Sequence, residues 1–149
     1  MSDKKKIELF DVGVAETSGG IAPALVLKSE DKFLPIYVGL SEAISANNGL
    51  KNEDSFRPFA HDIILKFLDK NDVKIDKVII DDLEEEIYFA QIVLRKNGEK
   101  TRIDARPSDS IALAVRKNVD IKIKKSILKD SSKSGEEIKE KMNSLDNYL

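Results

Sequence analysis

The sequence contains no cysteine and no tryptophan, and it has one histidine and four prolines among its 149 residues. Without cysteine, disulfides, thiolate metal sites and cysteine nucleophiles are excluded, and the absence fits a reducing, cytoplasmic location, which we expect. No apolar run approaches the roughly 18 residues needed to span a bilayer, and no apolar leader is present, so we expect no membrane partner. A Gly-rich phosphate loop is also missing, which argues against several common nucleotide-dependent enzyme classes.

Charged residues make up 35% of the chain, with 25 basic and 27 acidic side chains. A net charge of −2 argues against a protein that coats nucleic acid, so any contact with phosphate must be a local patch. The best basic patch comprises Lys122, Lys124, Lys125 and Lys129, which we interpret as a solvated strand edge. The acidic run 81–86 is interpreted as a solvated turn, although clustered carboxylates also suit a hard cation.

Hydrophobic patterns and turn residues predict strands and helices that alternate along the chain. Strands are expected at 7–15, 22–27, 33–38, 73–81, 87–95, 100–106 and 120–123. Helices are expected at 41–48, with Ser41 as N-cap and Gly49 as the stop, at 58–71 with an apolar face (Phe59, Ile63, Ile64, Phe67 and Leu68), and at 107–117.

The C-terminal part carries a separate helix signal. Ser134 and Glu137 have the spacing of a capping box, and Ile138, Met142, Leu145 and Leu149 would form a narrow apolar stripe on the following helix. The expected fold class is therefore α+β: a single compact domain with a mixed, mainly antiparallel sheet, flanking helices and a short C-terminal helix. We divide the chain into a domain at 1–130 and a polar linker with a helix at 131–149.

The segment 104–114 is the most informative part of the sequence. Asn97-Gly98 predicts a hairpin that pairs 87–95 with 100–106, because the favoured tight turn needs positive φ at both positions. Pro107 suits the first turn of a helix and pushes Arg106 into extended backbone, so Arg106 should end the strand. Asp104 and Arg106 should then share a strand face, about 6–7 Å apart.

A similar arrangement occurs earlier in the chain. Arg57-Pro58 precedes a helix start that carries His61 and Asp62, much as Arg106-Pro107 precedes Ser108 and Asp109. If the two helix starts converge, their amide groups and guanidinium groups would form a phosphate cradle. The sequence does not decide whether they converge.

Several of these segments resemble the bifunctional nuclease domain family. The similar segments are 34–43 (Leu-Pro-Ile-Tyr-Val-Gly-Leu-Ser-Glu-Ala), 57–62 (Arg-Pro-Phe-Ala-His-Asp), 88–90 (Tyr-Phe-Ala) and above all 104–114 (Asp-Ala-Arg-Pro-Ser-Asp-Ser-Ile-Ala-Leu-Ala), in the family's order. The resemblance runs from about Glu8 to Leu128. It implies a compact mixed α and β domain, an oligomer, and cleavage of both RNA and DNA with low sequence specificity. The chain departs from the family in Leu40 and Ser41, in polar Ser45, Asn47 and Asn48, and in lacking a proline within 118–121.

Phosphodiester cleavage needs an activated water, stabilised charge at phosphorus and help for the leaving oxygen. The candidate catalytic residues are His61, Asp62, Asp104 and Asp109, and the candidate substrate-binding residues are Arg57, Arg106 and Ser108. A divalent cation such as Mg²⁺ would take Glu42, Asp104 and Asp109 as ligands. In this hypothesis the arginines hold the phosphate and the histidine acts as acid or base.

Each candidate also has a structural interpretation. His61 would be a capped structural group, Glu42, Asp62 and Asp109 would complement helix dipoles, and Asp104 with Arg106 would form a strand-end ion pair. Two other functions therefore remain open beside the nuclease: a non-enzymatic oligomeric binding module, and a pocket for a small anionic metabolite at the Arg-Pro helix starts.

Overall fold

A computed structural model describes residues 2–149, and it has the expected α+β class with a mixed, mainly antiparallel sheet and flanking helices. The eight-stranded sheet has the order β3-β2-β1-β7-β4-β5-β6, and β8 pairs with β1. In chain order the elements are β1 (Lys4–Thr17), β2 (Gly20–Ser29), β3 (Lys32–Tyr37), α1 (Leu40–Lys51), α2 (Ala60–Lys70), β4 (Lys74–Glu84), β5 (Ile87–Lys96), β6 (Glu99–Ala105), α3 (Pro107–Lys117), β7 (Asp120–Lys124), α4 (Lys125–Ser131), α5 (Gly135–Lys141), β8 (Met142–Ser144) and a 3₁₀ turn, η1 (Leu145–Tyr148).

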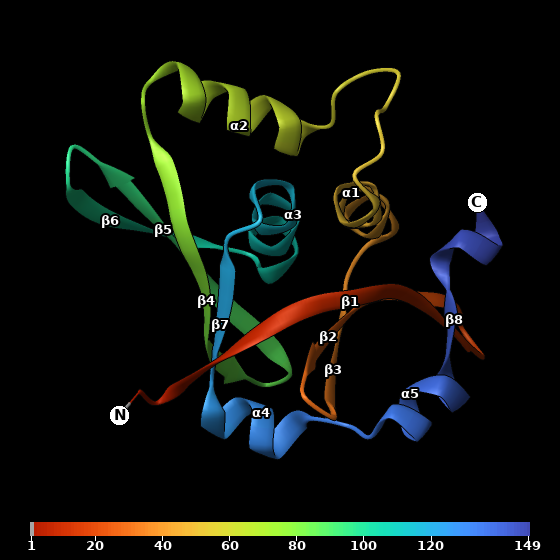
Figure 1. Cartoon of the computed structure of the whole chain (residues 1–149). Helices are drawn as coiled ribbons and strands as arrows, with labels where there is room; N and C mark the ends of the chain where they lie inside the picture. Colours follow the sequence, from red (N-terminus) through yellow and green to blue (C-terminus); the bar gives the residue numbers. More distant parts are fainter. Residues whose placement is uncertain (1) are drawn as a thin grey trace.

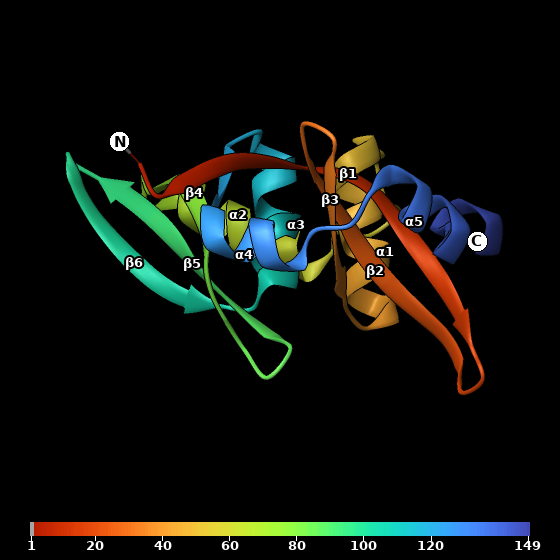
Figure 2. The same ribbon diagram turned by 90° about the horizontal axis from the view of Figure 1, so that it is seen from below.

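The long strand β1 joins the two parts of the sheet. Its start pairs with β7, whereas its later part pairs with β2 on one side and β8 on the other, and a bulge follows Leu9. In Figure 1 it crosses the molecule, with α1, α2 and α3 above it and α4 and α5 below. Figure 2 shows that the β1–β2 and β5–β6 hairpins extend at opposite ends. The helices and the core therefore lie between the two hairpins.

The core is aliphatic, and its largest side chains come from β1, β2, β3, β4, β7, α3 and η1. Its largest fully buried side chains are Ile7, Val12, Val14, Leu25, Val26, Leu27, Leu34, Ile79, Ile80, Ile111, Ile123 and Leu145. Helix α3 packs against β4, β5 and β7, and it also contacts α1. None of the helices in residues 2–149 combines the length and the apolar character that crossing a bilayer would require.

The hairpin and the helix after it match their predicted positions closely. Asn97 and Gly98 have φ of 52° and 79°, which is the positive-φ pair of a type I′ turn, and Lys96 pairs with Glu99 beside it. Helix α3 begins at Pro107, as expected for a proline in the first turn. The strand ends one residue early, at Ala105, because Arg106 takes the N-cap position.

The predicted limits of α1 are wrong at both ends. Gly39 is the N-cap in place of Ser41, and the helix continues past Gly49 until Asn52, whose φ of 52° ends it. Gly49 lies inside the helix, where a Cβ would come within 2.9 Å of both Val115 and Arg116. This glycine therefore permits the close approach of α1 and α3.

Most of the apolar face predicted for α2 is exposed to solvent, although Leu68 packs against the core. Ile63, Ile64 and Phe67 are 43%, 40% and 64% exposed, whereas His61 and Leu65 are buried. The imidazole of His61 faces inward and most of the apolar side chains face outward. A hydrophobic pattern alone does not reveal such an orientation. The position of α2 consequently depends on the polar contacts of its first turn.

The C-terminal helix is shorter than its apolar stripe predicted. Its capping box forms, but α5 ends at Lys141, Met142 enters β8, and Leu145 is buried in η1. Asn47 donates a hydrogen bond to Asp146 at 3.1 Å, so a polar residue of α1 contacts this segment. Strand pairing replaces the predicted continuous helix.

The interpretation of the lysine patch as a strand edge is wrong. Lys122 and Lys124 belong to β7, which lies between β1 and β4, and both are half-buried. Lys125 and Lys129 belong to α4, a helix that the sequence patterns did not predict.

Truncation of Leu145 should measure how firmly the C-terminal segment is docked. Leu145 is fully buried, so Leu145→Ala should lower the free energy of unfolding by about 2–4 kcal/mol through lost burial and a residual cavity. Leu149 is 71% exposed, and Leu149→Ala should change it by less than about 0.5 kcal/mol. Urea unfolding followed by circular dichroism measures both. Equal effects of the two substitutions would contradict the docking.

Candidate functional site

The N-terminus of α3 forms the corner that the sequence singled out. Arg106 has extended backbone (φ −66°, ψ 146°), and its carbonyl oxygen accepts bonds from the backbone N–H of Ser110 at 3.0 Å and from the Ser110 hydroxyl at 2.9 Å. Pro107 has no backbone N–H, so no hydrogen-bond acceptor is needed at this position of the helix start. The first turn of α3 is thereby fixed, and the Arg106 side chain is free to turn toward neighbouring elements.

The Arg106 guanidinium bridges two carboxylates. It donates to Asp109 through Nε at 2.8 Å and through Nη2 at 3.2 Å, and Nη1 donates to Glu42 at 3.2 Å. Glu42 lies over Gly39, where a Cβ would collide with its carboxylate. Glycine at the α1 N-cap therefore leaves room for Glu42 to fold back over the helix start.

His61 connects Asp109 to the interior of the molecule. Its Nε2 lies 2.9 Å from Asp109 Oδ1, and its Nδ1 lies 2.7 Å from Ser45 Oγ. Because an ionised carboxylate only accepts, the neutral form of the imidazole has its proton on Nε2, and its Nδ1 accepts from the serine hydroxyl. Ser45 in turn accepts from Arg116 Nη2 at 3.1 Å, so every donor in the series has an acceptor.

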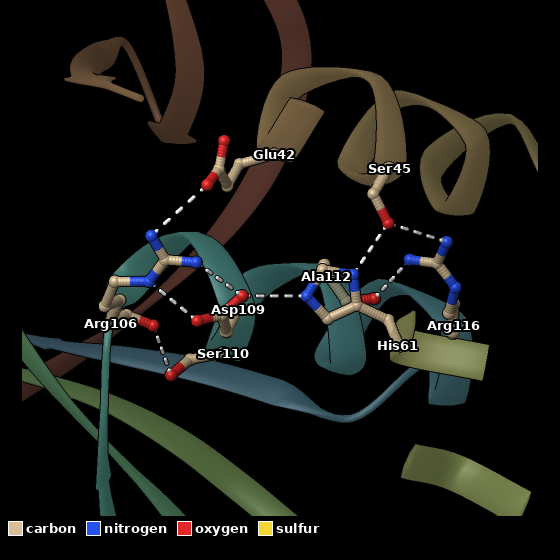
Figure 3. Close-up of polar contacts among 8 residues, drawn as sticks. All are labelled: Glu42, Ser45, His61, Arg106, Asp109, Ser110, Ala112 and Arg116. Carbon is tan, nitrogen blue, oxygen red and sulfur yellow. Dashed lines mark hydrogen bonds and ion pairs between the residues drawn. The ribbon is translucent and has the colours of Figure 1, made fainter. Parts of the chain in front are cut away.

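Figure 3 shows these contacts, and we call the series the polar chain. Its members are Arg106, Asp109, His61, Ser45 and Arg116. It joins the first turns of α2 and α3 to the middle of α1, so the two Arg-Pro helix starts do converge. They meet through His61 and Asp109, however, and not through paired arginines.

Arg116 anchors the buried end of the polar chain. Its Nε donates to Asp62 at 2.8 Å, its Nη1 donates to the Ala112 carbonyl at 3.0 Å, and its guanidinium lies 5.7 Å from the centre of the Phe59 ring. The other oxygen of Asp62 accepts the Phe59 backbone N–H at 2.8 Å, which caps α2. Asp62 therefore serves both as a helix cap and as the partner of a buried cation.

The two aspartates experience opposing influences on their pKa. Burial alone would raise the pKa of Asp109, but the hydrogen bonds from Arg106 and His61 outweigh it and the pKa is lowered. For Asp62, burial likewise opposes the hydrogen bonds from Arg116 and the Phe59 amide, and the pKa is again lowered. The hydrogen bonds to Asp109 raise the pKa of Arg106. Both carboxylates are consequently ionised at neutral pH.

The structure brings together four of the predicted site residues. Glu42, His61, Arg106 and Asp109 share hydrogen bonds, and Asp62 adjoins them through Arg116. Arg57 and Asp104 are exposed, and within residues 2–149 their side chains form no hydrogen bond or ion pair. Arg106 pairs with Asp109 and Glu42 instead of Asp104, because the backbone leaves the strand after Ala105.

The carboxylates do not form a ready cation site. No group of three His, Asp or Glu side chains in the described part of the chain could hold a metal ion. Glu42 and Asp109 both face the Arg106 guanidinium, and a cation would have to displace it. The residues present therefore do not fit the Mg²⁺ site that Glu42, Asp104 and Asp109 suggested.

A groove of about 770 Å³ opens beside this corner. Arg106 and Ser108 line it where α3 begins, Glu42 where α1 begins, and Tyr88 on β5. Its other charged lining residues are Glu86, Asp130, Lys133, Glu137 and Lys141, and the remainder is mostly apolar. The exposed face of the Arg106 guanidinium is therefore reachable from a groove of mixed polarity.

Sequence reasoning missed Ser45 and Arg116 as members of the site. Ser45 was noted only as a polar residue in a helix where an apolar one was expected, yet it is 3% exposed. Buried polar side chains require partners, so that polar residue was a signal for a buried contact. Arg116 gave no such signal, because a basic residue in the last turn of a helix commonly complements the dipole.

The chain is similar to known proteins over most of its length. The family model described as the bifunctional nuclease domain matches residues 25–136. An uncharacterized protein of Mycobacterium tuberculosis is 31% identical over 123 residues, which cover 81% of this chain and 73% of that protein. Bifunctional nuclease 1 of Arabidopsis thaliana is 34% identical over 109 residues, which cover 69% of this chain and 34% of the plant protein. Bifunctional nuclease 2 of Oryza sativa subsp. japonica is 32% identical over 111 residues, again 34% of its length.

Removal of the Asp62 charge should destabilise the protein in a pH-dependent way. Arg116 is 7% exposed in its side chain, so Asp62→Asn leaves a buried cation unpaired and should cost about 2–4 kcal/mol at pH 7. The folded pKa of Asp62 is lowered, so its contribution is complete above its unfolded value of about 3.9 and is lost as the pH falls through the folded pKa. The gap between wild type and variant should therefore narrow below about pH 4.

Urea unfolding at pH 7 and pH 3 measures that gap. Asp69→Asn is the matched control, because Asp69 is 61% exposed and its ion pair with Lys117 is 3.6 Å long. The control should change stability by less than about 0.5 kcal/mol. A gap for Asp62→Asn that is the same at both pH values would contradict the ionised contact.

Proposed function

Because the chain belongs to the bifunctional nuclease domain family, we propose that it is a nuclease that hydrolyses phosphodiester bonds of RNA and DNA with low sequence specificity. The names of the plant relatives support this activity. The observation that carries the proposal is the position of Arg106, an exposed guanidinium held between two carboxylates at a helix start and beside an open groove.

Arg106 is the proposed phosphate-binding residue. Guanidinium groups bind phosphate oxygens through paired N–H donors, and the N-terminus of α3 adds a favourable dipole for an anion. Its bond to Glu42 is solvent-accessible, since the Arg106 side chain is 63% exposed. A phosphate arriving from the groove would replace Glu42 on Nη1 and leave the Asp109 bonds intact. Arg57 and Ser108 are proposed as further contacts along the substrate.

Asp109 is the proposed residue that orients the attacking water. Its side chain is 32% exposed and ionised, so a carboxylate oxygen can accept a bond from water next to a phosphate held by Arg106. His61 has both ring nitrogens hydrogen-bonded and is buried, so we assign it to positioning Asp109. Asp62 positions α2 through Arg116, and Asp104 is proposed as an outer carboxylate on the approach to the corner.

The proposal also includes a cytoplasmic location and assembly into a homo-oligomer. The absence of cysteine supports the first, because it fits a reducing compartment. Exposed apolar side chains on α2 and β6 support the second, since such side chains commonly mark contact surfaces.

The groove favours a second candidate function, a pocket for a small anionic metabolite. Its lining combines Arg106 with apolar side chains, as small-molecule sites commonly do. A thermal-shift screen with phosphate and nucleotides tests it, and Arg106→Gln should abolish any shift. Absence of a shift with all of these anions would count against this candidate.

Substitution at the corner should abolish cleavage if the nuclease proposal is right. Arg106→Gln removes the positive charge that would stabilise the phosphate in the transition state, and it should lower kcat by about a hundredfold or more. Asp109→Asn should have an effect of similar size, because it removes the charge that orients water and holds Arg106. The measurement is hydrolysis of labelled RNA and single-stranded DNA by rigorously purified full-length protein.

Arg95→Gln is the control, because Arg95 is an exposed arginine that pairs with Asp76 on the sheet. It should retain the wild-type rate, and circular dichroism should confirm that all variants fold. If Arg106→Gln and Asp109→Asn cleave as fast as wild type, the activity is a contaminant or lies elsewhere, and a non-enzymatic binding module is favoured.

A further inference from the structure

The outer edge of β6 is an open sheet edge. β6 ends the strand order, and its residues from Glu99 to Asp104 are all exposed. Figure 2 shows it along one end of the molecule, with no other element beyond it. The opposite edge is different, because Phe33 of β3 exchanges backbone hydrogen bonds with Lys133. The β3 edge is thus bonded at one position to the chain's own backbone, whereas β6 has no strand on its outer side.

The backbone of β6 is arranged to accept another strand. The two-residue turn makes Lys96 and Glu99 a hydrogen-bonded pair, and such pairs alternate along an antiparallel ladder. The amide and carbonyl groups of Lys100, Arg102 and Asp104 therefore point away from β5. A β-bulge and a proline are two features that commonly protect an edge strand. β6 has neither, because the β5–β6 register is continuous and the strand contains no proline.

The side chains of β6 are self-complementary in one antiparallel register. If Ile103 lies opposite Ile103 of a second copy, Arg102 lies opposite Asp104 on both sides of the centre. Shifting one strand by two residues sets Arg102 against Arg102 in one direction, where Lys100 also falls opposite Asp104, and sets Asp104 against Asp104 in the other. Of these three registers, only the one centred on Ile103 has no like charges at its centre. Directly opposite pairs stabilise a sheet when their charges are opposite and destabilise it when they are alike.

The centre of this register is also apolar. Ile103 is 49% exposed although it pairs with Ile92 on the core side of the sheet, where Ala90 and Ala105 also lie. Its partner across the axis would cover it. At the ends of the register Lys100 falls opposite Arg106, and each already has an anionic partner, Asp76 at 3.3 Å and Asp109 at 2.8 Å.

We propose that two copies of this chain associate by antiparallel pairing of their β6 strands about Ile103, which makes one continuous sheet. Arg102 and Asp104 of each copy then form two cross-strand ion pairs and two reciprocal sets of backbone hydrogen bonds. The occupant is a second copy because its charge pattern is the complement of this edge. The inference gives the interface for the proposed homo-oligomer, and its test does not depend on nuclease activity.

A charge swap tests the interface. Sedimentation equilibrium of the full-length protein gives the dimer dissociation constant for wild type, Arg102→Asp, Asp104→Arg and the double variant. Each single substitution places like charges opposite each other twice per dimer and should raise the dissociation constant about tenfold or more. The double variant restores opposite charges and should return it to near the wild-type value. Lys96→Asp, a reversal on β5 outside the register, should leave it unchanged.

The outcomes separate the interface from the oligomeric state. A wild-type protein that stays monomeric at all concentrations overturns both proposals. A dimer that the single substitutions leave intact, or one that the double variant fails to restore, overturns the β6 interface and keeps the homo-oligomer. Circular dichroism and the slope of urea unfolding, compared with wild type, show whether each variant folds.

Discussion

The buried imidazole of His61 holds the three upper helices in a fixed relation. One ring nitrogen bonds to α1 through Ser45 and the other bonds to α3 through Asp109, while the ring itself belongs to α2. Helix α2 turns its most apolar side chains outward, so burial contributes less to its position than is usual for a surface helix. The hydrogen bonds of His61 and Asp62, together with Leu65, take over that role.

This constraint separates the structural and chemical parts of the site. Ser45, His61 and Asp109 are connected like the members of a serine hydrolase triad, but Ser45 is 3% exposed and also accepts a bond from Arg116. A substrate carbonyl or phosphorus atom has no route to that hydroxyl in the observed arrangement. The buried end of the polar chain therefore orients its neighbours, and in the proposed function it is the exposed end, Arg106 and Asp109, that contacts substrate.

Local sequence rules predicted much of the fold because several elements are governed by one or two residues. Asn97-Gly98 determines a hairpin register and Pro107 a helix start, and both act within a few residues. The predictions were wrong where contacts between residues far apart in the sequence determine the structure. Gly49 is explained only by the approach of Arg116, and the reversed face of α2 only by the partners of His61. Strand β8 was missed because its partner on β1 lies more than a hundred residues earlier.

The same distinction applies to the candidate site. Glu42, His61, Arg106 and Asp109 were selected from motifs near helix starts, and these starts meet in the fold. Ser45 and Arg116 are 71 residues apart and have no shared motif, so only the tertiary structure reveals their bond. Asp104 was grouped with the corner because of its sequence neighbourhood, whereas in the structure it belongs to the edge strand β6 and its side chain has no hydrogen bond to the corner residues. A short segment thus serves two surfaces, since strand alternation separates Asp104 from the helix start that follows two residues later.

That adjacency has a physical consequence for the corner. β6 runs directly into the N-cap of α3, so the backbone that presents Arg106 is the continuation of the outermost strand of the sheet. An unpaired edge strand is bonded on one side only and fluctuates more readily than a paired one. A second strand on that edge would restrict Ala105 and hence the direction in which the Arg106 guanidinium emerges. Assembly through β6 would therefore order the proposed phosphate-binding corner, where Lys100 of the second copy falls opposite Arg106.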